Sequence, residues 1–230
     1  MTVQASSPDI SAPTREEEQA DVIRRLEEDI IFGRFAPGSR LVEDTLMARY
    51  SASRHFVRQG LFQLERQGIV LREKNIGATV RFYSSEEVRQ IYEVREMLTR
   101  QAALMIALPA PASLIEQLTE LQRDYCARAD AQDLRGIHEA NDAFHVALFS
   151  ACGNPYLVRS LQDYMNLTLP MRAKNLADSE GLALSRRQHE FMIELLRGRD
   201  SWAFAQLCVD HMQFSKADYL GRIAGEKSAD

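Results

Sequence analysis

The sequence predicts a mainly α-helical protein, in which three helices and a β-hairpin precede an all-α bundle of about six helices. Three observations support this fold class. Apolar residues recur at spacings of three and four along most of the chain, as in amphipathic helices. Only 11 Gly and 7 Pro occur in 230 residues, which argues against a sandwich or barrel with many tight turns. After residue 84 no segment has the alternating pattern of a strand.

The chain is expected to divide into two domains flanked by short tails. Between the tails 1–14 and 226–230, the predicted domains are 15–82 and 83–225. The N-terminal helices are expected at 16–32, 43–50 and 54–67, and the two strands of the hairpin at 69–71 and 78–82. Gly33 ends the first helix, and Ser53 is placed to cap the third.

The second domain is expected to be helical throughout. Ser84 and Glu87 form a capping-box pattern that opens a helix ending before Pro109. Further helices are expected at 112–129, 131–152, 155–176 (kinked at Pro170), 181–197 and 200–223.

Composition and charge narrow the function. The net charge is -5, yet residues 32–81 hold nine Lys and Arg against four Asp and Glu, whereas residues 82–230 hold sixteen against twenty-one. A basic segment joined to an acidic one is consistent with a nucleic-acid-binding part and a separate second part. No apolar run is long enough for a membrane span, and no secretory signal is expected. The three cysteines do not make a disulfide framework, so a cytoplasmic protein is expected.

Two short helices, the second one basic, followed by a hairpin with a polar tip describe a winged helix-turn-helix. In that arrangement the second helix enters the major groove of DNA. Arg54, His55 and Arg58 would then face base edges or phosphates, and Lys74 and Asn75 at the hairpin tip would contact the backbone. The alternative is that these residues form an ordinary solvated surface.

Three segments of this part resemble the GntR family of transcription regulators. They are residues 35–43 (FAPGSRLVE), 53–70 (SRHFVRQGLFQLERQGIV) and 75–80 (NIGATV). The resemblance implies a winged-helix fold and DNA contacts by Arg54, Arg58 and the hairpin tip. The chain departs from the family at His55-Phe56 and at Ile76, and Gly60 interrupts a helix at a cost of about 1 kcal/mol relative to Ala.

Polar residues interrupt the apolar faces of the second domain. Asn141 and His145 lie one helical turn apart, and His189 and His211 lie on apolar stripes of two other helices. Bundle cores build metal sites from side chains on facing helices. The alternative is three separate core histidines, each satisfied by a hydrogen bond.

Residues 141–145 (NDAFH) and 151–157 (ACGNPYL) resemble the signature of the FCD effector-binding domain of FadR-like GntR regulators. The resemblance implies a divalent-metal site formed by an Asp and three His, which here correspond to Asn141, His145, His189 and His211. Asn in place of Asp brings no charge, so weaker metal binding is expected. A nitrogen-rich set with one oxygen suits Zn²⁺, Ni²⁺, Fe²⁺ or Mn²⁺.

Two arginines on apolar stripes, Arg95 and Arg172, are candidate effector contacts. A buried guanidinium needs a partner, and a small carboxylate could bridge it and the metal. The alternative for Arg95 is an internal salt bridge with Glu139 or Glu190.

These features predict a sequence-specific DNA-binding regulator, most readily a repressor, controlled by a small organic acid. It is expected to act as a homodimer on a pseudo-palindromic operator, and not as an enzyme. Two alternatives remain at this point, the same regulator with a metal-free effector pocket and, remotely, a metal-dependent hydrolase.

Overall fold

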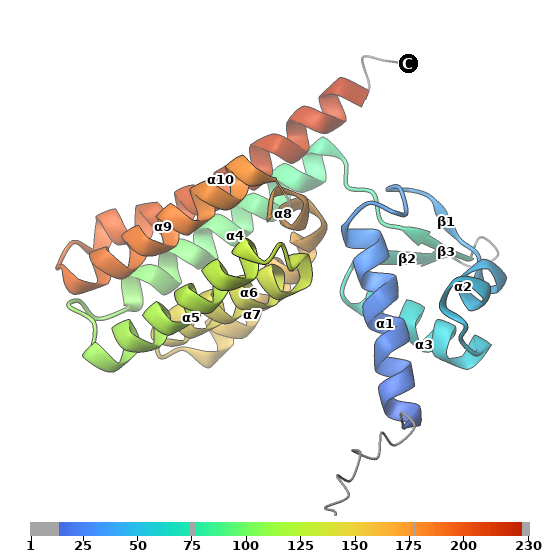
Figure 1. Cartoon of the computed structure of the whole chain (residues 1–230). Helices are drawn as coiled ribbons and strands as arrows, with labels where there is room; N and C mark the ends of the chain where they lie inside the picture. The colour runs from blue at the N-terminus through green and yellow to red at the C-terminus, as the bar shows by residue number, and fades with distance from the viewer. Residues whose placement is uncertain (1–13, 74–76, 177, 227–230) are drawn as a thin grey trace, which may run out of the picture.

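The computed structural model describes residues 14–73, 77–176 and 178–226, which form a small helix-and-sheet part and a larger helical bundle (Figure 1). The mainly α fold class is confirmed. The elements of the N-terminal part are α1 (Arg15–Ile31), β1 (Arg40–Leu41), α2 (Glu43–Tyr50), α3 (Arg54–Arg66), β2 (Val70–Glu73) and β3 (Gly77–Val80). The helices of the bundle are α4 (Ser85–Met105), α5 (Ala112–Asp130), α6 (Leu134–Ser150), α7 (Pro155–Leu167), α8 (Leu169–Leu176), α9 (Ser179–Arg197) and α10 (Ser201–Glu226).

The N-terminal part is held together by one apolar core between α1, α3 and the sheet. Leu26 of α1 and Leu64 of α3 are fully buried in it. The sheet is antiparallel with strand order β1-β3-β2. The predicted hairpin is β2 and β3, but the sequence prediction missed β1, whose two residues are too short to show an alternating pattern.

A buried carboxylate joins α1 to α2. Asp29 accepts hydrogen bonds from Arg34 (2.6 Å), from Arg49 and from the Tyr50 hydroxyl (2.8 Å). Burial raises the pKa of Asp29, but these hydrogen bonds outweigh it and hold the pKa below its ordinary value. The charge is therefore retained and fixes α2 relative to α1.

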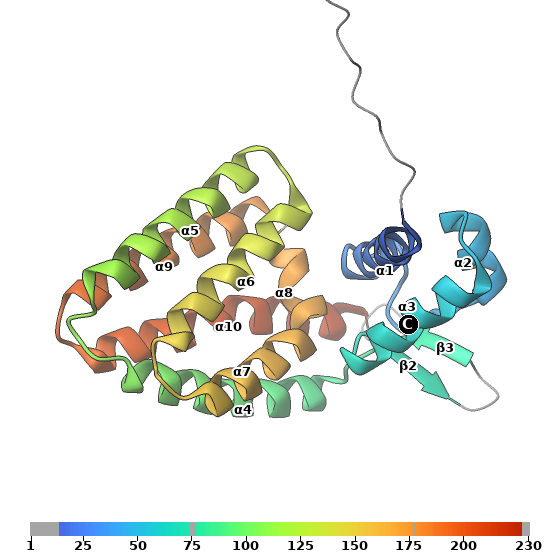
Figure 2. The ribbon, with the colours of Figure 1, turned by 90° about the horizontal axis from the view of Figure 1, so that it is seen from below.

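Two long helices form the spine of the bundle. α4 and α10 run side by side, while α5 packs on α6 and α9 lies between α5 and α10 (Figures 1 and 2). Both Ser84 and Glu87 make the capping-box hydrogen bonds that open α4, as predicted. None of the helices in the described part of the chain is long and apolar enough to cross a membrane.

The bundle has seven helices over the described residues, where the sequence predicted about six. The predicted helix 155–176 is interrupted near Pro170, as expected, but as a break at Thr168 and not as a kink, so that it restarts as α8. Pro170 then occupies the first turn of α8, where a proline needs no backbone donor.

The two parts of the molecule touch along α1, α3, α6 and α8. Leu169, the first residue of α8, is buried in the apolar core of the N-terminal part. The Tyr83 hydroxyl donates to the Gly68 carbonyl (2.8 Å), and Arg135 of α6 pairs with Glu28 of α1 (3.6 Å). A displacement of α8 therefore reaches the N-terminal core directly.

The glycine inside α3 gives a stability test. A methyl group built at Gly60 would lie 3.5 Å from Ile23 and 3.7 Å from Leu26, which is ordinary van der Waals contact. We expect Gly60→Ala to raise the free energy of unfolding by about 0.5–1 kcal/mol in urea denaturation.

Gly136→Ala is the contrasting variant, since its methyl group would clash with the Asp133 carboxylate, which caps α6 at the Gly136 N–H and pairs with Arg128, and it should destabilise the chain. A Gly60→Ala protein no more stable than the wild type would contradict this packing.

Candidate functional sites

The first candidate site is the exposed start of α3. The Ser53 side chain accepts a hydrogen bond from the Phe56 backbone and caps the helix, as predicted. Arg54 and Arg58 lie on the surface with side chains 53% and 58% exposed, and His55 is also exposed. Phe56 and Val57, in contrast, are buried in the core and do not reach the surface.

Both arginines at the start of α3, Arg54 and Arg58, are already paired with carboxylates of α2. Arg54 contacts Asp44 at 2.7 Å, and the Arg58 Nε donates to both oxygens of Glu43 at 2.9 and 3.0 Å. Exposed pairs of this kind contribute about 0–1 kcal/mol. DNA phosphates or base edges can therefore displace the carboxylates at low cost, although the acidic groups remain near the bound strand.

The predicted contacts at the hairpin tip, Lys74 and Asn75, lie outside the described residues. The strands on either side, β2 and β3, are antiparallel and pair Glu73 with Gly77 across the tip.

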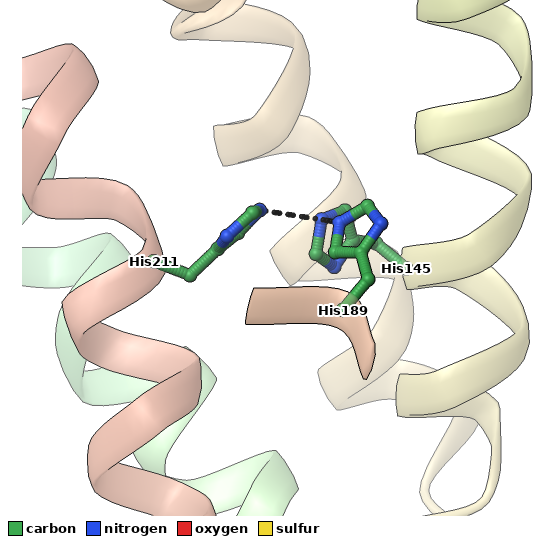
Figure 3. A group of neighbouring side chains, drawn as sticks. All are labelled: His145, His189 and His211. Atoms are coloured by element: carbon green, nitrogen blue, oxygen red, sulfur yellow. Dashed lines mark hydrogen bonds between the residues drawn. The ribbon is translucent and has the colours of Figure 1, made fainter. Parts of the chain in front are cut away.

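The second candidate site is a cluster of three histidines inside the bundle. His145 of α6, His189 of α9 and His211 of α10 point toward one another (Figure 3). The His145 Nε2 lies 3.1 Å from the His211 Nε2 and 3.3 Å from the His189 Nε2. One nitrogen of each ring lies within 4.8 Å of the other two, a spacing at which three imidazoles can bind one metal ion.

Two glutamine side chains orient the rings. The Gln122 amide donates to the Arg186 carbonyl (3.1 Å), so its oxygen faces the His189 Nδ1 (2.9 Å) and accepts from it. The His189 Nε2 consequently carries a lone pair. Gln188 contacts the His211 Nδ1 in the same way at 2.8 Å.

In both His189 and His211 the proton lies on Nδ1, so the Nε2 lone pairs are free to bind a cation. With lone pairs on His189 and His211, a single Nε2 proton on His145 can satisfy only one of its two close nitrogen contacts. Burial lowers the pKa of His145 and His189 well below the ordinary value and that of His211 to about 3, with Arg95 and His211 among the further causes. All three rings are thus neutral and available as ligands.

Asn141 completes the predicted ligand set one turn before His145. It is buried and lines the same small cavity, about 40 Å³, as His145 and His211. Its hydrogen bond to Asp142 uses the amide nitrogen, so the amide oxygen keeps its lone pairs for another contact. Asp142 itself is held by Arg172 at 2.6 and 3.0 Å.

Two guanidinium groups, those of Arg95 and Arg172, are buried and line the same cavity. Arg95 is 6% exposed and donates from Nη1 to the Thr168 hydroxyl (2.8 Å). The expected alternative, an ion pair with Glu139 or Glu190, is not found, and no carboxylate of the described residues pairs with Arg95. Burial lowers the pKa of Arg95 to about 10, so it stays charged at neutral pH.

Sequence reasoning missed the roles of Gln122, Gln188 and Thr168. Gln122 lies among the buried residues Leu118 and Tyr125 of α5, and a polar residue on such a stripe signals a specific partner. Its partner, 67 residues away in sequence, could not be read from the chain.

The N-terminal part is a winged helix-turn-helix with two exposed arginines at the start of α3, and a helical bundle with a polar cavity follows it. This architecture defines a DNA-binding transcription regulator with a second, helical domain. Comparison with family models identifies the family of regulators to which the chain belongs. The FCD domain model matches residues 90–214, and the model of the bacterial regulatory proteins of the gntR family matches residues 18–80. The chain belongs to the GntR family of transcription regulators and carries an FCD domain.

Similar proteins agree with this assignment. The HTH-type transcriptional repressor GlaR of Escherichia coli is 26% identical over 84% of this chain and 91% of its own length. The Nta operon transcriptional regulator of Aminobacter aminovorans is 25% identical over 78% of this chain and 83% of its own. These relatives are regulators and not enzymes, which removes the support for a hydrolase.

Solved structures share the fold. A putative GntR regulator from Rhodococcus sp. RHA1 has a TM-score of 0.67 at 24% identity, covering 88% of this chain and 97% of its own. McbR/YncC of E. coli has a TM-score of 0.68 at 18% identity, covering 90% and 98%.

We expect the Asp44–Arg54 pair to weaken DNA binding, because Asp44 occupies a guanidinium that could contact a phosphate. Asp44→Asn removes a negative charge beside the DNA-binding helix and releases Arg54 for phosphate contact. We expect tighter binding to random-sequence DNA and a plot of log affinity against log salt that is steeper by about 0.9. Fluorescence anisotropy across a salt series measures both.

Asp210→Asn makes the same charge change on the exposed side of α10 and serves as the control. Equal effects of the two substitutions would mean that Asp44 acts only through net charge.

Proposed function

We propose that this chain is a cytoplasmic, sequence-specific repressor of transcription. Its operator affinity would depend on a small carboxylate that binds in the helical domain together with a divalent metal ion. The observation that carries the proposal is that a cluster of three imidazole nitrogens adjoins a cavity lined by His145, His211 and the Arg95 guanidinium. We assign DNA binding to residues 15–82 and effector binding to residues 83–225.

The metal would be held by Asn141, His145, His189 and His211, and Zn²⁺, Ni²⁺, Fe²⁺ and Mn²⁺ all suit this donor set. When bound, the ion supplies a Lewis-acidic centre for a carboxylate oxygen. The chain's own contribution is orientation, because Gln122 and Gln188 turn the Nε2 atoms of His189 and His211 toward the cavity.

The effector carboxylate would be held by Arg95, with Arg172 at the same cavity. Arg95 has an Nε without a hydrogen-bond partner among the described residues, and an ionised carboxylate satisfies such a donor well. The cavity volume of about 40 Å³ favours a small acid.

The signal would pass through the break between α7 and α8. Arg95 donates to Thr168, and the next residue, Leu169, is buried in the N-terminal core. An effector that draws Arg95 away from Thr168 favours a different placement of α8, and hence of the DNA-binding part, through a population shift. In a homodimer, such a shift changes the spacing of two α3 helices against a pseudo-palindromic operator.

A metal-free effector pocket is the second candidate, because Asn141 brings no charge to the ligand set. Metal analysis of untagged protein purified without chelator or nickel resin separates the two readings. Stoichiometric metal supports the first, and its absence supports the second.

Specific DNA recognition is tested at Arg58. After selection of an operator from random double-stranded DNA, we expect Arg58→Ala to lose about 1–3 kcal/mol of specific binding free energy, with a much smaller loss on random DNA. Electrophoretic mobility shifts measure both affinities.

Arg66→Ala is the matched control, since Arg66 is exposed at the opposite end of α3. Unchanged specific affinity of Arg58→Ala would refute the recognition role of this residue.

The metal site is tested by removing two of its rings. We expect His189→Ala with His211→Ala to abolish stoichiometric metal while DNA binding of the effector-free protein persists, because α3 lies in the other part of the molecule. Elemental analysis and mobility shifts provide the two readouts.

His138→Ala is the control, because His138 faces Asp142 at 3.7 Å and does not belong to the three-histidine cluster. Retained metal in the double variant would refute the site.

A further inference from the structure

A second cavity lies where α1 of the N-terminal part faces the bundle (Figure 1). Its walls come from both parts of the molecule, because α1 and α3 line one side and α6 lines the other. Its volume is about 320 Å³. Sites for small molecules commonly measure about 300–1,000 Å³ and occur preferentially between domains. No lining residue is shared with the histidine cavity, so the two are separate.

The charged residues that line this second cavity leave one carboxylate without a partner. Arg135 of α6 pairs with Glu139 (2.6 Å) and with Glu28 (3.6 Å). Arg24 of α1 also pairs with Glu28, at 3.2 Å. Glu27 makes no hydrogen bond or ion pair within the described residues, although it faces the same cavity. The lining therefore holds one carboxylate more than it holds guanidinium groups.

The surroundings of Glu27 disfavour its ionised form. The side chain is half-buried, and burial raises the pKa of Glu27, a shift that the Arg135 charge opposes only in part. Further negative charge that raises this pKa comes from Glu28, Asp142 and Glu139. A positive group placed beside Glu27 would stabilise the carboxylate. A titratable group that is perturbed by burial and lies in a cavity is a candidate binding residue.

The remaining lining of the cavity defines the kind of cation. Ile23 and Ile31 of α1 are buried, and Phe32 at the end of α1 lines the cavity with them. A ligand gains free energy by burying an apolar body against such side chains. A metal ion does not fit, because within the described residues only the three-histidine cluster brings three ligating side chains close enough. The matching ligand is an organic ammonium ion.

We propose that the cavity between α1 and α6 binds a small organic ammonium ion, whose charged group pairs with Glu27 and whose apolar body lies against Ile23, Ile31 and Phe32. Such a ligand contacts both parts of the molecule and stabilises their present relative placement, so it shifts the conformational equilibrium of the regulator. This inference does not depend on the metal ion or the carboxylate of the proposed function, because the two cavities are lined by different residues.

Isothermal titration calorimetry on the untagged full-length chain tests the proposal. Benzylamine, which is positively charged at neutral pH, is the probe. Benzyl alcohol has the same ring without the charge, and methylamine has the charge without the ring. We expect benzylamine to bind more tightly than either, because only benzylamine combines both features.

Glu27→Gln removes the charge and nearly preserves the shape of the side chain. We expect this variant to bind benzylamine about 10–100-fold more weakly, the usual loss for a hydrogen bond that involves a charged group. The variant is expected to fold, because Glu27 has no partner to lose and its surroundings disfavour the charge.

Glu16→Gln is the matched control, since it makes the same change at an exposed position about three turns earlier on α1. Equal benzylamine affinity of the wild type and Glu27→Gln would overturn the proposal. So would benzyl alcohol that binds as tightly as benzylamine, or the absence of benzylamine binding at concentrations up to about 10 mM. Loss of benzylamine binding in the variant with His189→Ala and His211→Ala would place the amine in the histidine cavity and would also overturn it.

Hydrogen–deuterium exchange of the full-length chain locates the bound amine. We expect benzylamine to slow exchange in peptides from both α1 and α6 of the wild type, because the ligand stabilises the contact between them, and to leave Glu27→Gln unchanged. Slower exchange in only one of the two helices would overturn the placement of the ligand between the two parts.

Discussion

The hydrogen bond between Arg95 and Thr168 fixes the start of α8, the helix whose first residue enters the core of the N-terminal part. Thr168 lies where α7 ends and α8 begins, and its hydroxyl donates to the Tyr164 carbonyl (2.9 Å) while it accepts from Arg95 (2.8 Å). Four residues later, Arg172 reaches the cavity and pairs with Asp142. Between them, Leu169 is buried in the N-terminal core. One short segment therefore meets the regulatory cavity and the DNA-binding part together.

The sequence was sufficient for the elements whose signals are local. Helical periodicity and caps such as Ser53 and the Ser84–Glu87 box gave most helices within a few residues of their observed bounds. It was also sufficient to bring His145, His189 and His211 together as a cluster, because each lies on the apolar face of its own helix and the three faces enclose one core.

The sequence did not indicate the contacts that form between segments distant along the chain. The partner of Arg95 is a hydroxyl 73 residues away, not one of the carboxylates that seemed suitable. In the same way, nothing local indicated that Glu43 and Asp44 would pair with Arg58 and Arg54 at the start of α3. Secondary-structure propensity depends on the residues of one segment, whereas these side-chain pairings depend on where the fold places a second segment.

The two candidate sites differ in how their arginines are compensated, and this difference fits a switch. Arg54 and Arg58 are exposed and paired, so replacing a carboxylate with a phosphate exchanges one weak surface pair for another and needs little rearrangement. Arg95 is buried, has an Nε without a hydrogen-bond partner among the described residues and forms no ion pair with them, so an anionic ligand would stabilise its charge. A ligand shifts a conformational equilibrium only by its difference in affinity for the two states. That difference is expected to be large where the ligand-free state is electrostatically least satisfied, so the proposed control of operator affinity is better located at Arg95 than at the exposed, already paired arginines of α3.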